Sequence, residues 1–508
     1  MKTNTERKIG AILSYAIIIV NMIIGIVYTP ILTSKLQQSE YGLYSLVTSI
    51  ISYLTILDFG FGNAIIIYTA RYKVTNQKEK EEKLHGMFFL IYIAIGIIAG
   101  IIGIILCFNV ENLFANTMTN EELEKAQILM SILTFNLIIT FPLSIFSSII
   151  TSYEKFVFAK LLNLARIILN PIIMLVLLNL GYKSIALVIL NTILNIGTLV
   201  LNLLYCKFKL DIKLKFGKIE KKLLKEISAY SVWIFLNSII DRIECNVDQF
   251  VLGIVSGTRV VAIYSVANQL NQMYLNFSVA ISGVMLPKVT KMEEAGASDK
   301  EFTNIFIRTG RIQYIIMALI MSGFILYGKE FITLMWVGSE YEQSYIIACI
   351  LMIPVTIPLI QNVGLNIIQA KNQYKFRVMV LLFFAVVNLI ISIFLSKIYG
   401  GIGAAIGTAI SMILGKTIFM NIFYYKKTHI DIPLFWKNIL KMTIPILIAI
   451  TIGIIIKTIN PITNKFNLII EIFVYTLIYI SMMWKLGMNN YEKELIIKPF
   501  NKVLKRRA

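Results

Sequence analysis

The sequence predicts an all-α integral membrane protein with about fourteen transmembrane helices, in two six-helix lobes followed by a C-terminal helix pair. Of its 508 residues, 57% are apolar and 15% are charged, and the mean hydropathy is +0.76. Soluble proteins carry about 45–50% apolar and roughly 25% charged residues. Apolar runs long enough to cross a hydrocarbon core of about 30 Å also recur along the chain. The main body is therefore not a soluble enzyme, a disulfide scaffold or a disordered chain.

Fourteen apolar runs, separated by polar segments, are the predicted spans. The first follows Lys2, Arg7 and Lys8; it is too long for a signal-peptide core and lacks a small-residue cleavage site, so it counts as a span. In chain order the runs are 9–34, 41–68, 86–107, 126–151, 156–179, 184–206, 227–255, 260–287, 305–327, 344–369, 376–396, 402–425, 442–457 and 466–484.

Basic residues are concentrated in alternate loops, which predicts the orientation. One set of loops, which includes both termini, holds 37 of the 48 Lys and Arg residues, and the other set holds 8. Cytoplasmic loops carry the excess of Lys and Arg, so both termini are expected in the cytoplasm of a multi-pass cell-membrane protein. Topology and attraction to anionic membrane lipid explain the net charge of +20 better than nucleic-acid binding does.

A weak internal repeat predicts the two lobes. Short matches recur at an offset of about 220 residues, among them Tyr44-Ser45 with Tyr264-Ser265. Six spans per repeat gives two halves of the same orientation, as in transporters whose halves surround a substrate cavity. The expected domains are an N-lobe (1–206), a basic cytoplasmic linker (207–226), a C-lobe (227–425) and a final segment with two helices and a basic tail (426–508).

Ionisable residues inside spans are costly and usually face a cavity or a partner, so they are the candidate site residues. Four lie in the seventh span: Asp241, Arg242, Glu244 and Asp248. At 100° per residue, Asn237 shares a helix face with the three acidic residues, and Asn246 and Gln249 lie with Arg242 on the adjacent face. Glu244 and Asp248 form a like-charge i,i+4 pair, which is unfavourable without a compensating charge.

This stripe suits an ion-coupling site or the polar wall of a wet cavity, and both interpretations stay open. Arg166, Arg242 and Lys416 are the candidates for an anionic phosphate group. Asp58, in the second span beside Gly60 and Gly62, either faces the cavity or has a structural role. Glu471, near the outer end of the last span, is expected at the membrane interface.

Other motifs do not indicate catalysis or a cofactor. Gly415-Lys416-Thr417 resembles the end of a phosphate-binding loop, but Ile410 stands where that loop needs its first glycine, so no nucleotide is expected. Gly96 and Gly100 are interpreted as helix-packing positions. The four cysteines have no metal-ligand spacing. We therefore expect a protein that is not an enzyme and that holds neither a metal nor a cofactor.

Several short segments have a distinctive composition: TPIL at 29–32, QSEYGLYSL at 38–46, LDFGFG at 57–62, Asn237-Ser238 with DQFVLG at 248–253, AIYSVA at 262–267 and FITLMWVGSEY at 331–341. These segments resemble those of bacterial polysaccharide-export flippases of the multidrug/oligosaccharidyl-lipid/polysaccharide (MOP) exporter superfamily. The resemblance implies a flippase that moves an undecaprenyl-pyrophosphate-linked oligosaccharide from the inner to the outer leaflet. In such a protein the lobes alternate between inward- and outward-open states around a cationic cavity.

The resemblance leaves the substrate open. Related lipid II flippases place several arginines in the cavity, whereas the spans here hold only Arg166 and Arg242, which favours a capsule or surface-polysaccharide unit. The alternatives are a lipid II flippase and a cation-coupled multidrug exporter that uses the acidic stripe. The implied partners are the lipid-linked oligosaccharide, membrane lipid and a polysaccharide polymerase. A scaffold or membrane enzyme is disfavoured because no loop holds a catalytic constellation.

Overall fold

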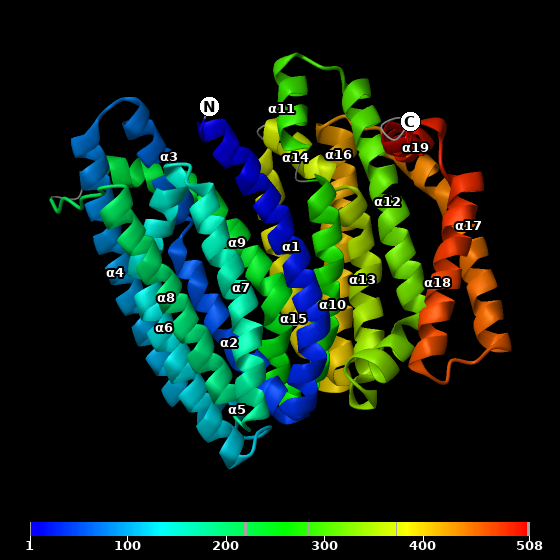
Figure 1. Ribbon diagram of the computed structural model, residues 1–508, viewed down its shortest axis with the longest axis horizontal. Coiled ribbons are helices and arrows are strands. Elements are labelled where there is room, and N and C mark those ends of the chain that lie inside the picture. Colours follow the sequence, from blue (N-terminus) through cyan, green and yellow to red (C-terminus); the bar gives the residue numbers. More distant parts are fainter. Residues whose placement is uncertain (1, 218–220, 283–284, 372, 505–508) are drawn as a thin grey trace. The chain divides into compact units, whose positions relative to one another are not determined.

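The computed structural model describes residues 2–217, 221–282, 285–371 and 373–504, and nearly all of them are helical (Figure 1). No strand occurs in these ranges. The chain divides into two compact units: a first unit of residues 1–265 and 385–404, and a second unit of residues 266–384 and 405–508. Each unit is described by itself.

The first unit contains the helices α1 (Lys2–Lys35), α2 (Gln38–Leu54), η1 (Thr55–Asp58), α3 (Phe61–Val74), α4 (Lys78–Phe108), α5 (Val110–Phe114), α6 (Asn120–Ser152), α7 (Phe156–Asn179), α8 (Ser184–Lys209) and α9 (Lys221–Ser256). Residues of both units belong to α10 (Thr258–Ser282) and α15 (Tyr374–Met412). The second unit contains α11 (Leu286–Glu294), α12 (Asp299–Glu330), η2 (Phe331–Trp336), η3 (Ser339–Tyr341), α13 (Gln343–Ile360), α14 (Val363–Ala370), η4 (Ile413–Phe419), α16 (Met420–Lys427), α17 (Ile432–Ile459), α18 (Lys465–Met482), η5 (Met483–Gly487) and α19 (Asn490–Leu504).

In the part of the chain that the structure describes, each predicted span falls mainly on helix, although residues 283–284 of the span 260–287 lie outside it; the count of fourteen is not confirmed. Twelve described segments are long and apolar enough to cross a membrane. One reason is α10, which carries polar residues such as Asn268, Gln269 and Asn271 and is absent from the twelve. The other is a kink at Gly400 (φ 55°), where two helices follow one another without a gap; the predicted spans on either side of it are therefore counted as one segment, 375–427.

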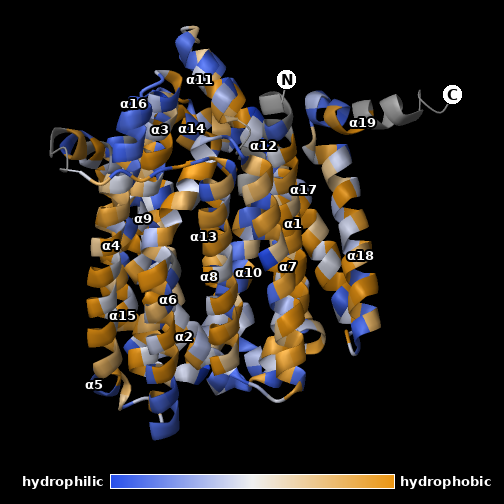
Figure 2. Ribbon diagram, turned by 60° about the vertical axis from the view of Figure 1, so that its left-hand side comes forward, coloured by the Kyte–Doolittle hydropathy of each residue, from blue (hydrophilic) through white to orange (hydrophobic). Residues whose placement is uncertain are grey.

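The helices present apolar surfaces outward, as a bilayer requires. Hydrophobic residues (orange) cover much of α1, α4 and α7, and hydrophilic residues (blue) gather at helix ends (Figure 2). Exposed large side chains include Ile19, Ile23 and Ile98. A helix satisfies its backbone hydrogen bonds internally, which hydrocarbon cannot do for it. These facts establish a multi-pass membrane protein.

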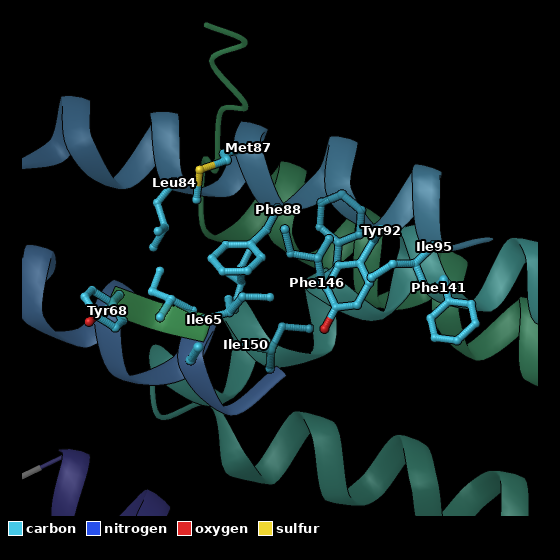
Figure 3. Close-up of a cluster of buried hydrophobic side chains, with 14 of the residues drawn as sticks. Ile65, Tyr68, Leu84, Met87, Phe88, Tyr92, Ile95, Phe141, Phe146 and Ile150 are labelled. Atoms are coloured by element: carbon cyan, nitrogen blue, oxygen red, sulfur yellow. The ribbon is translucent and has the colours of Figure 1, made fainter. Parts of the chain in front are cut away.

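The first unit has a close-packed core between α3, α4 and α6. Ile65, Phe88, Phe146 and Ile150 interdigitate there, with Tyr92 beside them (Figure 3). The α4 glycines let α6 approach closely: a Cβ added at Gly96 would lie 2.9 Å from the Ile138 carbonyl oxygen, and one at Gly100 would lie 2.7 Å from the Ile138 side chain. The predicted packing role of this glycine pair is thus confirmed.

The basic linker lies against the start of α4 where the structure describes it. The Lys215 backbone N–H donates to the Glu82 carbonyl (3.1 Å), and its amino group bonds the Glu82 carboxylate (3.0 Å). That hydrogen bond raises the pKa of the Lys215 amino group. A Cβ on Gly86 would come within 2.1 Å of the Lys215 carbonyl oxygen, so the contact depends on glycine.

The second unit is built around α12, on which α13, α17 and α18 pack. Its core contains Leu326, Met442, Tyr475 and Tyr479. The tyrosine hydroxyls are satisfied within that core, because Tyr475 donates to Ser322 (2.6 Å) and Tyr479 donates to the Ile315 carbonyl (2.8 Å). The tyrosines therefore fix the position of α18 on α12.

Candidate functional site

Arg166, on α7, is held by amide groups. Its guanidinium donates to Asn195 Oδ1 on α8 (3.1 Å), and Asn195 Nδ2 donates to Asn136 Oδ1 (2.9 Å) and Thr140 Oγ1 (2.8 Å) on α6. Among the residues that the structure describes, no carboxylate lies within ion-pair distance of Arg166. An oriented cation within a span thus keeps its positive charge uncompensated by protein, as an anion-binding group requires.

A second amide pair lies one helical turn further along α7. Asn170 donates to Asn191 Oδ1, and the Asn191 amide donates to the Tyr44 hydroxyl (3.4 Å). Asn170 is four residues after Arg166 and Asn191 four before Asn195, so the two contacts follow one another along the α7–α8 interface. The result is a polar row inside an otherwise apolar helix pair.

The acidic stripe of α9 divides into an accessible part and a buried part. Asn237 Nδ2 donates to Asp241 Oδ2 (3.0 Å), and Asp241 is exposed. Arg242 and Glu244 are half-buried. Within the described part of the chain, Arg242 makes no hydrogen bond or ion pair, so its guanidinium is available to a ligand.

Asp248 and Gln249 instead connect α9 to α10. The Tyr264 hydroxyl donates to the Asp248 carboxylate, which is 2% exposed, and Gln249 Nε2 donates to Ser265 Oγ (3.1 Å). The backbone carbonyl oxygen of Asn246 accepts a hydrogen bond from Ser49 Oγ on α2 (3.0 Å). The Tyr264 hydroxyl of the next helix therefore supplies a hydrogen bond to Asp248, the buried member of the predicted like-charge pair with Glu244.

Asp58 caps a helix break. Phe59 and Gly60 both adopt left-handed φ values, 52° and 72°, and interrupt the second span between η1 and α3. The carboxylate of Asp58 accepts from the Tyr92 hydroxyl (2.6 Å) and from the backbone N–H groups of Gly60 and Gly62. Three hydrogen-bond donors thus reach the Asp58 carboxylate, and two of them are backbone N–H groups at the N-terminus of α3. This arrangement favours a structural role for Asp58 over a role in the cavity.

Lys416 lies in the second unit, on the π-helical turn η4. It lines a pocket with Arg377, which was not among the candidate site residues predicted from the sequence. The structure thus divides the candidate cations between the units, with Arg166 and Arg242 in the first and Lys416 in the second.

Glu471 is buried within the second unit. It is only 3% exposed, and its Oε1 accepts from Asn460 Nδ2 (3.4 Å) on the loop before α18. Its expected position at the membrane interface stays a prediction.

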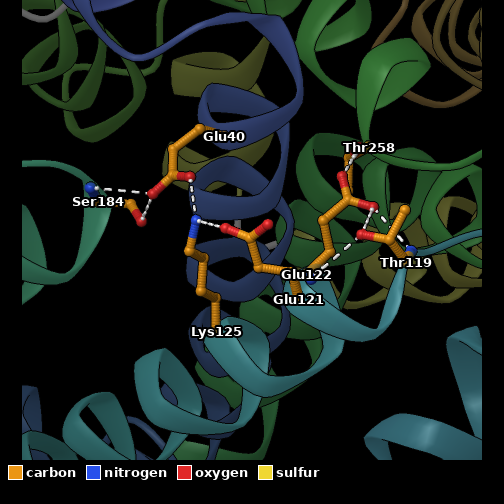
Figure 4. Close-up of polar contacts among 7 residues, drawn as sticks. All are labelled: Glu40, Thr119, Glu121, Glu122, Lys125, Ser184 and Thr258. Carbon is orange, nitrogen blue, oxygen red and sulfur yellow. Dashed lines mark hydrogen bonds and ion pairs between the residues drawn. The ribbon is translucent and has the colours of Figure 1, made fainter.

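A polar network at one end of the first unit was not predicted (Figure 4). Glu40, on α2, accepts from the Ser184 hydroxyl and pairs with Lys125 on α6 (3.1 Å). Lys125 also pairs with Glu121 (2.8 Å). The ends of α2, α6 and α8 are joined in this way. The only signal in the sequence was that these charges stand at the ends of apolar runs.

The same network reaches the α9–α10 turn. Glu122 accepts from the backbone N–H of Thr119 (2.9 Å) as part of a capping box, and it also accepts from the Thr258 hydroxyl (2.7 Å). Thr117 Oγ1 donates to the Gly253 carbonyl (2.7 Å). A polar cavity of about 440 Å³ lies among these residues. The start of α6 therefore holds the α9–α10 turn through two hydroxyl groups.

Comparison with known proteins places the chain in a family. A profile described as "Polysaccharide biosynthesis protein" matches residues 8–293. The chain therefore belongs to the polysaccharide biosynthesis protein family. A comparison with curated proteins gave no match.

Solved structures show the same fold. One is the lipid II flippase MurJ in an inward closed conformation: TM-score 0.71, 19% identity, 93% of this chain and 97% of that chain covered. Another is an inward-facing multidrug resistance MATE family transporter of the MOP superfamily, with a TM-score of 0.59 and 15% identity; the match covers 81% of this chain and 99% of that chain. A third is a MOP superfamily transporter from Pyrococcus furiosus, with a TM-score of 0.53 and 14% identity; the match covers 83% of this chain and 95% of that chain.

The solved structures define the fold class of the chain. The chain has the fold of MOP superfamily transporters and flippases, and these proteins move molecules rather than catalyse reactions. The predicted resemblance, the all-α membrane fold and the expectation that the chain is not an enzyme agree with this class.

Proposed function

We propose that this protein is a flippase that translocates an undecaprenyl-pyrophosphate-linked oligosaccharide, a capsule or surface-polysaccharide repeat unit, from the inner to the outer leaflet of the cell membrane. The termini face the cytoplasm. Transport proceeds by alternating access, and a polysaccharide polymerase uses the exported unit.

The observation that carries the proposal is the pair of span arginines in the first unit, Arg166 and Arg242. Neither meets a carboxylate among the described residues, and Arg166 is oriented by Asn195. Arginine is well suited to bind phosphate oxygens, because its planar, always charged guanidinium can donate two parallel hydrogen bonds to them. Two such cations suit an anionic pyrophosphate better than a cationic drug.

The membrane potential supplies a driving force without ATP. An inside-negative potential favours outward movement of negative charge by about 2.3 kcal/mol per charge per 100 mV. Asp241 and Glu244, which are accessible, are the remaining candidates for ion coupling.

The test is to delete the gene and to weigh the lipid-linked sugars in membrane extracts by mass spectrometry. Accumulation of one undecaprenyl-pyrophosphate oligosaccharide supports the proposal and identifies the substrate. Accumulation of lipid II indicates the lipid II flippase instead. Unchanged lipid pools with new sensitivity to cationic dyes indicate the drug exporter.

Complementation then tests the arginines. Arg166→Ala and Arg242→Ala are expected to fail to restore surface polysaccharide, whereas Arg71→Ala, which removes an exposed cation at the end of α3, is expected to restore it. Full restoration by a variant that lacks both span arginines would contradict their role.

A further inference from the structure

A pocket of about 190 Å³ in the second unit lies beside two cations. It is bounded by α10, α13, the start of α14, α15, η4 and α16. The side chains that supply its polar wall are Arg377, Lys416, Gln361, Asn362 and Tyr424. None of the described lining residues is an aspartate or a glutamate.

Two helix irregularities meet at this pocket. On one side, α13 contains Pro354 and Pro358 and ends at Ile360, and Gln361 and Asn362 form a turn before α14 begins. On the other side, η4 is a π-helical turn that carries Lys416. Within a membrane, irregular backbone occurs where it is buried in protein or lines a cavity, and π-helical turns are frequent at functional sites.

The amide groups of the pocket are fixed in advance. Gln361 is 2% exposed, and its Nε2 donates to Asn421 Oδ1 (2.9 Å), which also accepts from Trp436 Nε1 (3.3 Å). Asn362 Nδ2 donates to Ser278 Oγ (3.1 Å). These contacts hold the two side chains in one orientation without any ligand.

One acceptor in this arrangement has no protein donor. Gln361 Oε1 is buried and has no hydrogen-bond partner among the described residues. A buried polar atom normally finds a partner, so an unpartnered one indicates a missing donor. A hydroxyl group on a ligand supplies such a donor.

We propose that this pocket binds the diphosphate of an anionic lipid head group, with Arg377 and Lys416 as its cationic ligands and Gln361 Oε1 as acceptor for an adjacent sugar hydroxyl. The assignment rests on the proposed function and adds Arg377 and Gln361 to it. The planar guanidinium of Arg377 can donate two hydrogen bonds to one phosphate group, and the ammonium of Lys416 contributes a compact positive charge. The apolar wall, which includes Leu275, Leu365 and Leu381, excludes water and strengthens both interactions.

The test uses the purified full-length protein in nanodiscs and titrates inorganic pyrophosphate by calorimetry. Each hydrogen bond to a charged group contributes about 1.5–3 kcal/mol. Because every 1.4 kcal/mol is tenfold in affinity, Arg377→Ala and Lys416→Ala are each expected to weaken binding by roughly ten- to a hundredfold. Arg377→Lys is expected to restore part of the loss. Arg308→Ala, which removes a cation of α12 outside the pocket, is the matched control and is expected to bind like the unchanged protein.

Thermal unfolding of each variant separates a binding defect from a folding defect, and Lys416→Met, which keeps the stem volume, replaces Lys416→Ala if the latter unfolds. Unchanged pyrophosphate affinity in Arg377→Ala and Lys416→Met overturns the assignment. Competition of pyrophosphate by phosphatidylglycerol vesicles, without competition by a short-chain polyprenyl diphosphate, overturns it in favour of a site for membrane phospholipid.

Failure of this inference and failure of the proposed function are distinguishable. If deletion causes the lipid-linked oligosaccharide to accumulate but the pocket variants bind pyrophosphate normally, only the pocket assignment fails. If the pocket variants lose pyrophosphate but deletion leaves all lipid pools unchanged, the pocket binds anions and the flippase proposal fails.

Discussion

A buried ion pair attaches the C-terminal helix α19 to the second unit, and its removal has a calculable effect. Arg311, on α12, makes a bidentate contact with Glu492: Nε to Oε1 at 2.6 Å and Nη2 to Oε2 at 2.9 Å. The Arg311 and Glu492 side chains are 7% and 3% exposed. Arg311 also donates to the carbonyls of Gly487 (2.9 Å) and Asn438 (3.3 Å). The pair thus joins α12, α17 and the start of α19.

Glu492→Gln removes the charge and keeps the cap of α19. The Glu492 carboxylate accepts from the Asn489 backbone N–H (2.9 Å), and a glutamine carbonyl retains that bond. Removing one partner of a buried pair costs about 3–5 kcal/mol, because the remaining charge stays buried without compensation. At tenfold per 1.4 kcal/mol, the opening equilibrium of α19 rises more than a hundredfold.

Hydrogen exchange measured by mass spectrometry on residues 489–497 of the purified protein detects this opening. We expect exchange in Glu492→Gln to be at least a hundredfold faster there and unchanged in α4. Lys83→Ala is the control, because its pair with Glu79 is exposed and such pairs contribute about 0–1 kcal/mol. Exchange within tenfold of the unchanged protein refutes the reasoning. Arg311→Met with Glu492→Leu should lose less than the two single changes added together.

Three further predictions concern the first unit. Gly42→Ala places a Cβ 1.8 Å from the Thr258 carbonyl oxygen, so it should destabilise the protein by about 1–3 kcal/mol in thermal unfolding. Thr258→Val removes the donor to Glu122 and should speed hydrogen exchange of the backbone amides of the α9–α10 turn about tenfold or more, since a bond to a charged group contributes about 1.5–3 kcal/mol. Tyr92→Phe removes a donor to Asp58 and should lower the free energy of unfolding by about 1–3 kcal/mol.

Matched changes serve as controls for the first two of these predictions. Gly197→Ala meets no atom within 4 Å and should leave stability unchanged or slightly raised. Thr33→Val removes a hydroxyl that bonds only its own helix, at the Thr29 and Pro30 carbonyls, and should leave the α9–α10 turn as it was. An equal effect in a control and its partner change would show that the specific contact is not responsible.

The helices could be predicted from the sequence, but several of their ends could not: α4 begins at Lys78 where the predicted span begins at 86, and α17 begins at Ile432 where it begins at 442. Hydrocarbon offers the backbone no hydrogen bonds, so an apolar run of sufficient length forms a helix irrespective of its neighbours. The packing role of Gly96 was predictable for the same reason, because it depends on helical spacing alone. The kink at Gly400 lies between the spans predicted at 376–396 and 402–425, where the apolar runs are interrupted.

Only the tertiary structure decided which polar side chains are buried and what they contact. Asp248 accepts a hydrogen bond from Tyr264, Glu471 accepts one from Asn460, and Arg377 lines a pocket with Lys416. A helical pattern fixes the face on which a side chain lies, but not the residue that a neighbouring helix brings to that face. Such contacts join segments up to 197 residues apart, as in the bond from Ser49 to the Asn246 backbone carbonyl. The cost of burying charge is therefore settled by packing, which no local pattern in the sequence contains.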